Sequence, residues 1–153
     1  MNKSTEQAVF AMLMLALQKH HRPVRSSTLA RVLRVSDSYL KKVLKAMVDA
    51  GLLQAVAGRD GGYCLTRPIT EFTYGHVFDA LEGFEHPVTS TALARAVYEP
   101  SDHLEASIAL VDEIHAKAAA AFIAELHQLP LARLLVPDAL ADGLIDWEAG
   151  TGG

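Results

Sequence analysis

The 153-residue sequence lacks several features that mark secreted, membrane-bound and thiolate-metal proteins. Its one cysteine, Cys64, excludes an intrachain disulfide and a cage of several thiolate ligands. No uninterrupted apolar run approaches the ~18 residues of a transmembrane helix. Residues 1–4 do not resemble a signal peptide, and the apolar stretch that follows has no small-residue cleavage site. These absences predict a cytoplasmic protein without membrane association.

The residue patterns of enzymes are missing as well. There is no nucleophile motif and no paired set of metal ligands. The glycine-rich residues 58–62 lack the lysine and the following helix of a phosphate-binding loop. Seven histidines are scattered along the chain, and surface or interface roles are the simpler interpretation for them. We therefore predict no enzymatic activity, no metal and no cofactor.

Acidic residues are scarce in one part of the chain. Residues 19–67 hold ten Lys or Arg against three Asp, a net charge of +7, whereas the whole chain carries −4. The remainder therefore carries −11. This segregation is typical of a phosphate-binding surface on an acidic body, although a chance cluster on solvated faces is the alternative. It favours double-stranded DNA as a partner.

Apolar periodicity and turn residues indicate the order of elements in residues 1–83. We predict helices over residues 8–17, 27–33, 36–50 and 74–81, and strands over residues 52–56 and 63–65. Residues that favour helix starts precede the helices: Ser4 with Gln7, Ser26 or Ser27, Ser36, and Thr73. Two helices joined by a tight turn and followed by a glycine-turned hairpin predict a winged helix-turn-helix. The fold class is therefore mainly α with a small β-hairpin wing.

Residues 102–129 form the longest periodic segment, and we predict a long dimerisation helix there. Its apolar stripe consists of Leu104, Ile108, Val111, Ile114, Ala118, Phe122 and Leu126. Little chain is left to cover this stripe, so a partner helix from a second copy is favoured over a helix folded back on its own domain. Residues 84–101 would connect the two parts with a short helix near 91–97. Residues 130–153 would form a short helix over 134–147 and a tail.

The helix over residues 36–50 is expected to enter the major groove, braced by the helix before it. Hydroxyls, backbone N–H groups and ammonium groups at helix starts suit phosphate oxygens and base edges. The candidate DNA-binding residues on the two helices are Ser26, Ser27, Thr28, Ser36, Ser38, Tyr39, Lys41, Lys42 and Lys45. Arg59, at the apex of the hairpin, fits a narrow minor groove. Simpler roles are a helix cap for Ser36, packing for Tyr39 and a solvated turn for Arg59.

Three stretches of sequence together resemble one family of regulators. They are residues 36–45 (SDSYLKKVLK), residues 50–53 (AGLL) and residues 58–65 (GRDGGYCL), followed by residues 77–83. The combination closely resembles the Rrf-two family (the BadM, IscR and NsrR type) over roughly the first 83 residues. The resemblance implies a homodimer that grips a palindromic operator, with the long helices crossing at the dimer interface.

The sequence departs from the family pattern in two places. Many members carry a basic residue just before the first wing glycine, where this chain has Ala57. Cluster-bearing members hold an iron–sulfur cluster with three cysteines between the fourth helix and the long helix, and residues 84–103 contain none. A cluster of the usual cysteine-ligated kind is therefore excluded.

Without a cluster, a small-molecule effector is the expected switch, if the protein responds to more than its own abundance. Phe84, His86, Val97 and Tyr98 supply apolar surface with polar groups, which is the usual make-up of an effector pocket. The alternative is that these side chains only dock the fourth helix onto the long helix. For the whole protein, we predict a transcriptional regulator, with repression as the expected sign. A winged-helix interaction module that has lost DNA binding is the alternative.

Overall fold

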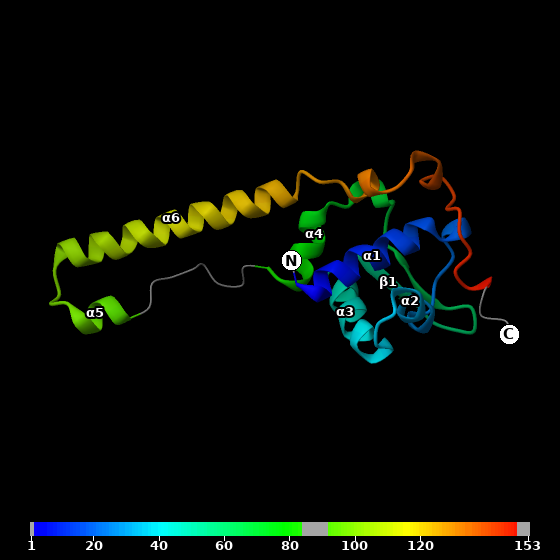
Figure 1. Ribbon diagram of the computed structural model, residues 1–153, viewed down its shortest axis with the longest axis horizontal. Helices are drawn as coiled ribbons and strands as arrows, with labels where there is room; N and C mark the ends of the chain where they lie inside the picture. The colour runs from blue at the N-terminus through cyan, green and yellow to red at the C-terminus, as the bar shows by residue number, and fades with distance from the viewer. Residues whose placement is uncertain (1, 84–91, 150–153) are drawn as a thin grey trace.

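The structure is a computed structural model that describes residues 2–83 and 92–149. A winged domain lies at one end, and a long helix projects from it like an arm (Figure 1). The helices are α1 (Lys3–Leu17), α2 (Ser26–Leu33), α3 (Asp37–Asp49), α4 (Tyr74–Leu81), α5 (Leu93–Val97) and α6 (Asp102–Leu126). The strands are β1 (Leu53–Val56) and β2 (Gly62–Leu65). Short 3-10 turns span Lys19–His21, Ile69–Glu71, Leu131–Leu134 and Pro137–Ala139.

Helix α1 is the central element of the winged domain, and it begins earlier than predicted. The Asn2 side chain caps it by accepting a hydrogen bond from the backbone N–H of Thr5. The predicted capping box of Ser4 and Gln7 is therefore wrong, because both residues already lie inside the helix. From Ala8 to Ala16 every side chain except that of Phe10 is buried, so the helix is covered on nearly all sides.

The helix-turn-helix follows the local signals in the sequence. Arg34, at φ 56°, ends α2 in the left-handed conformation, and its N–H donates to the carbonyls of Ala30 and Arg31. Ser36 then caps α3, with its hydroxyl accepting from the backbone N–H of Tyr39. Helix α3 ends at Asp49 and is followed by the cap residue Ala50 and by Gly51, whose positive φ of 75° suits glycine. These features confirm the predicted third helix.

The hairpin is antiparallel, with Leu53 opposite Leu65 and Val56 opposite Gly62. The segment before α2 pairs with it as well, because Val24 and Tyr63 exchange backbone hydrogen bonds of 2.9 and 2.8 Å. Gly62 adopts φ 152°, and a Cβ there would lie 2.5 Å from the carbonyl atoms of Val24. The wing is therefore attached to the start of α2 through a close backbone contact that requires glycine.

Replacing Gly62 by alanine is expected to destabilise the protein by roughly 2–3 kcal/mol, because the methyl group would force Val24 away from β2. Gly58→Ala is a matched control: its φ is 107°, but a Cβ there meets nothing within 4 Å. We expect that variant to lose only about 1 kcal/mol from backbone strain. Urea unfolding measures both. Equal losses for the two variants would show that the contact with Val24 contributes nothing.

The chain after α6 returns to the winged domain instead of forming the predicted helix over residues 134–147. Leu131 is fully buried in the same core as Leu29, Leu40 and Phe72. Beyond it the chain consists of short turns and extended residues that run along the end of α1 (Figure 1). The predicted helix is wrong because Pro137 opens a short turn and Gly143 adopts a positive φ of 67°. The backbone N–H groups of Leu144 and Ile145 donate to the carbonyl of Leu17 instead of to helical partners.

Contacts between α4 and the end of α6 fix the direction of the arm. The His127 ring lies against Gly75 and between Thr73 and Asp79, at 2.9 Å from the hydroxyl of Thr73 and 2.9 Å from the carboxylate of Asp79. The rings of Phe78 and Phe122 pack edge to face with centroids 5.4 Å apart. The direction of α6 is thus determined by side chains of α4.

Candidate nucleic-acid interface

The first turn of α3 presents polar side chains to solvent. The hydroxyls of Ser36 and Ser38 lie 2.9 Å apart, and both residues are exposed. Tyr39 is 42% exposed, and its phenol oxygen lies 2.5 Å from the hydroxyl of Ser4 on α1. Tyr39 therefore combines an exposed ring with a fixed hydroxyl, which positions the ring at the helix start.

Three exposed lysines follow on the same helix. Lys41 pairs with Asp37 at 2.7 Å, and Lys45 pairs with Asp49 at 2.7 Å. Lys42 makes no ion pair within residues 2–83 and 92–149. The Lys41 ammonium, followed by the Ser26 hydroxyl, lowers the pKa of the Asp37 carboxyl, and Asp37 in turn raises the pKa of Lys41. Exposed pairs of this kind contribute little to stability, so these lysines can exchange their partners for phosphates.

The start of α2 differs from the prediction. Arg25 occupies the N-cap position without a side-chain cap, so neither Ser26 nor Ser27 caps the helix. Ser27 is exposed and Ser26 partly exposed. Thr28 is buried, and its hydroxyl donates to the Glu148 carboxylate at 3.0 Å. Thr28 is therefore not exposed to a DNA phosphate in this conformation.

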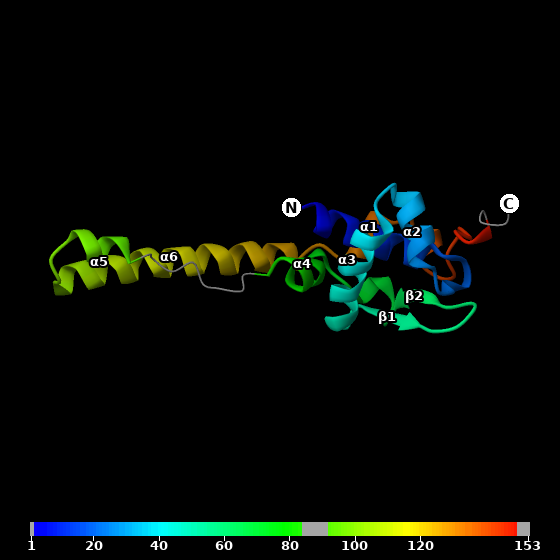
Figure 2. The same ribbon diagram turned by 90° about the horizontal axis from the view of Figure 1, so that it is seen from below.

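Arg59 is exposed in the loop of the hairpin, as predicted from the sequence. The guanidinium of Arg25 donates a hydrogen bond to the backbone carbonyl of Arg59 at 2.9 Å. Because Ser26 lies beside Asp37, the start of α2 contacts both the wing loop and the start of α3. Figure 2 shows α2, α3 and the hairpin at one end of the molecule, with α6 directed away. The predicted DNA-contacting elements therefore share one region of the winged domain.

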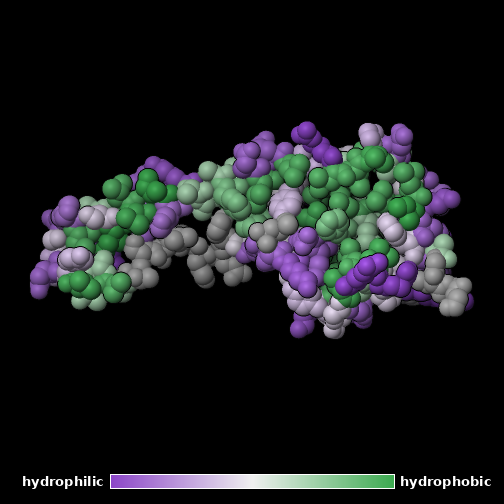
Figure 3. Space-filling view, in the orientation of Figure 1, coloured by the Kyte–Doolittle hydropathy of each residue, from purple (hydrophilic) through white to green (hydrophobic). Residues whose placement is uncertain are grey.

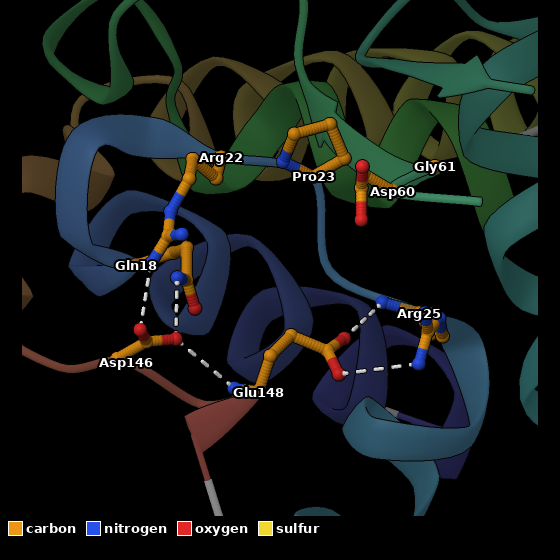
Figure 4. Close-up of a pocket in the computed structure, with 8 residues that line it drawn as sticks. All are labelled: Gln18, Arg22, Pro23, Arg25, Asp60, Gly61, Asp146 and Glu148. Atoms are coloured by element: carbon orange, nitrogen blue, oxygen red, sulfur yellow. Dashed lines mark hydrogen bonds and ion pairs between the residues drawn. The ribbon is translucent and has the colours of Figure 1, made fainter. Parts of the chain in front are cut away.

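Sequence reasoning missed a group of charges next to this region. A pocket of about 580 Å³ lies between the wing loop and the C-terminal segment (Figure 4). Arg22 pairs there with Asp146 at 2.6 Å, and Arg25 lies beside Glu148. The two acids follow the arginines by more than a hundred residues, so local patterns could not have paired them.

The structure describes only two of the four residues of the predicted effector pocket, so the pocket stays a prediction. Val97, at the end of α5, and Tyr98, just after it, are 64% and 65% exposed, and neither lines the pocket of Figure 4 or a second pocket beside Cys64. Phe84 and His86 lie outside the described residues. Helix α5 instead pairs with α6 through Arg95 and Glu105, whose charged groups lie 2.7 Å apart.

The projecting helix α6 exposes apolar side chains of the predicted stripe. Val111, Ile114 and Phe122 are 49%, 56% and 49% exposed, and Ala118 is exposed as well. Apolar surface extends along the arm formed by α5 and α6 (Figure 3). Ile108 is buried within the chain, and Leu104 and Leu126 are half-buried, so these three residues offer less apolar surface to a partner.

The described residues do not fit a metal centre. Within residues 2–83 and 92–149, no group of three or more His, Cys, Asp or Glu side chains is placed to hold a metal ion. Cys64 lies on β2, where the Gln54 amide nitrogen is 3.2 Å from its sulfur. None of the helices in the described ranges has the length and apolar character needed to cross a membrane.

The arrangement of α2, α3 and the wing is that of a winged helix-turn-helix transcriptional regulator. A family model described as Rrf2, an iron-dependent transcriptional regulator, matches residues 1–137. The chain belongs to this Rrf2 family, which confirms the resemblance read from the sequence. The relatives of known class are HTH-type transcriptional regulators, which bind DNA, and not enzymes.

Individual relatives support the same assignment. The chain is 34% identical over 115 residues to YwgB of Bacillus subtilis, named as an HTH-type transcriptional regulator, covering 74% of each chain. It is 42% identical to YffB of Lactococcus lactis, another HTH-type regulator, over 51% of this chain and 50% of that relative. The solved structure of CymR from B. subtilis, titled as its global cysteine regulator, matches with a TM-score of 0.63 at 22% identity, covering 88% of this chain and 94% of CymR. The CymR match confirms the fold class.

Proposed function

We propose that the protein is a repressor that binds a palindromic operator as a homodimer in the cytoplasm, without an iron–sulfur cluster. The observation that carries the proposal is the shared position of the α3 start, the α2 start and the wing loop. Helix α3 would read base edges in the major groove through Ser38 and Tyr39, while its lysines contact phosphates. Arg59 would reach the adjacent minor groove.

The dimer is supported by α6. A helix with Val111, Ile114 and Phe122 about half exposed carries apolar surface along one stripe. Two such helices packed together would cover both stripes, and alanines such as Ala118 would allow close approach. Crossing α6 helices would also place two α3 helices at a fixed separation, as successive major grooves about 34 Å apart require.

The absence of a cluster is supported by the donor set. The chain's single cysteine lies in the wing, away from the junction of α4 and α6. A cluster held by cysteine thiolates needs several of them, so iron cannot be the switch through such a site. A small organic ligand is the proposed class of effector.

Titration of a labelled DNA duplex at several salt concentrations tests DNA binding. We expect log K to fall with log[salt] by about 0.9 for each phosphate contacted.

Arg59→Ala is expected to weaken binding on the order of tenfold in the same titration, because a guanidinium in the minor groove is lost. Weak binding with no salt dependence in the wild-type protein would instead support an interaction module that has lost DNA binding.

A further inference from the structure

The C-terminal residues 142–149 are fastened to the end of α1 by buried polar contacts. Gln18 is 1% exposed, donates to the Asp146 carboxylate at 3.2 Å and accepts from the backbone N–H of Trp147 at 3.0 Å. The indole N–H of Trp147 donates to the carbonyl of Met14 at 2.8 Å. The segment therefore has a defined docked position.

Two carboxylates of this segment lie on basic groups of the winged domain. Asp146 accepts from the Arg22 guanidinium at 2.6 Å. Glu148 accepts from the backbone N–H of Arg25 at 2.8 Å and from the hydroxyl of Thr28 at 3.0 Å, and it lies 4.0 Å from the Arg25 guanidinium. The Glu148 carboxylate thus covers the N-terminus of α2, where partial positive charge and unpaired N–H groups attract anions (Figure 4).

Arg25 and the start of α2 lie between the two elements that are expected to contact DNA. Arg25 holds the backbone of Arg59 in the wing loop, and Ser26 lies beside Asp37 at the start of α3. When α3 is in the major groove, the helix before it crosses the phosphate backbone. A phosphate at the α2 N-terminus would therefore meet the Glu148 carboxylate, and two anions cannot share the site.

We propose that residues 142–149 are a built-in competitor of the DNA backbone, in which Asp146 and Glu148 hold the phosphate-binding groups Arg22, Arg25 and the α2 N-terminus until DNA displaces them. The inference rests on the proposed DNA binding. It makes the start of α2, with Arg22 and Arg25, a second phosphate-binding element besides α3. Because the segment must leave, the free energy of its docking is subtracted from the affinity for DNA. Any event that releases the segment would raise DNA affinity.

Glu148→Gln in the full chain tests the competition, because the amide keeps a hydrogen-bond acceptor and removes the charge. We expect about fivefold tighter binding to a DNA duplex near 0.1 M salt, since the neutral side chain weakens the docking that DNA must overcome. The slope of log K against log[salt] should stay near the wild-type value, because DNA displaces the segment in both proteins and the same phosphates are engaged. Asp142→Asn is the matched control: Asp142 lies in the same segment but pairs with exposed His20. We expect it to bind as the wild type does.

Trp147 gives a second readout that needs no substitution, because it is the only tryptophan in the chain. Saturating DNA should shift its fluorescence emission to the red and raise its quenching by acrylamide, as the indole leaves Met14 for water. An unchanged emission at saturating DNA would overturn the proposal, as would Glu148→Gln binding no tighter than the wild type at an unchanged Tm. Failure of the proposed function is distinguishable, because the wild-type protein would then show no salt-dependent DNA binding at all.

Discussion

Replacing Val111 and Ile114 by glutamate is expected to give a monomer and to lower the affinity for a palindromic operator by roughly 10²-fold or more, because the second half-site is then no longer bound intramolecularly. Both side chains are about half exposed on α6 in the single chain. Charges there would be desolvated between two α6 helices, and the interface would be lost. Analytical ultracentrifugation measures the mass, and operator titration measures the affinity.

The choice of residues follows from the structure of the arm. Phe122 also belongs to the predicted stripe, but its ring packs on Phe78, so a charge there would disturb α4 as well as the dimer. Ala109→Glu with Ala120→Glu is the matched control, because both alanines are exposed and lie about half a turn away from the stripe. We expect the control to stay dimeric. A Val111 and Ile114 variant that sediments as a dimer with wild-type affinity would contradict an interface on this stripe.

Replacing Lys41 and Lys42 together by alanine is expected to weaken binding to all DNA sequences by roughly 30- to 100-fold and to reduce the salt slope by about 1.8. Both lysines lie in the first half of α3, and in the proposed complex their ammonium groups would meet the phosphates that flank the major groove. The effect should be the same for operator and random duplexes, since phosphate contacts carry no sequence information.

Lys117→Ala controls for the loss of a surface ion pair. Lys117 pairs with Glu113 four residues earlier on α6, as Lys41 pairs with Asp37 on α3, but it lies on the projecting arm. We expect wild-type DNA affinity and salt slope for this variant. If Lys41 and Lys42 can be removed with equally little effect at an unchanged Tm, α3 does not face the DNA backbone.

The helix-turn-helix and the wing were predictable because short-range residues determine them. Ser36 caps α3, Gly51 ends it, and Thr73 caps α4, and each acts within a few residues of its position. The hairpin follows from glycines between two apolar runs. The resemblance to the Rrf2 family was read from the same stretch of chain, so the fold class was available from sequence alone.

The sequence by itself determined the helix-turn-helix, the wing and their basic charge, while the tertiary structure decided what covers them. Gln18 and Asp146 are separated by 128 residues along the chain, yet they form a hydrogen bond. Residues 142–149 take their backbone and side-chain partners from residues 14–28, at the end of α1, the start of α2 and the turn between them, so the predicted helix there was overridden by distant contacts. The same distant contacts bury Thr28 and place Glu148 at the start of α2. Local sequence patterns could not predict them, because such patterns indicate only the hydrogen bonds that a segment makes with its sequence neighbours.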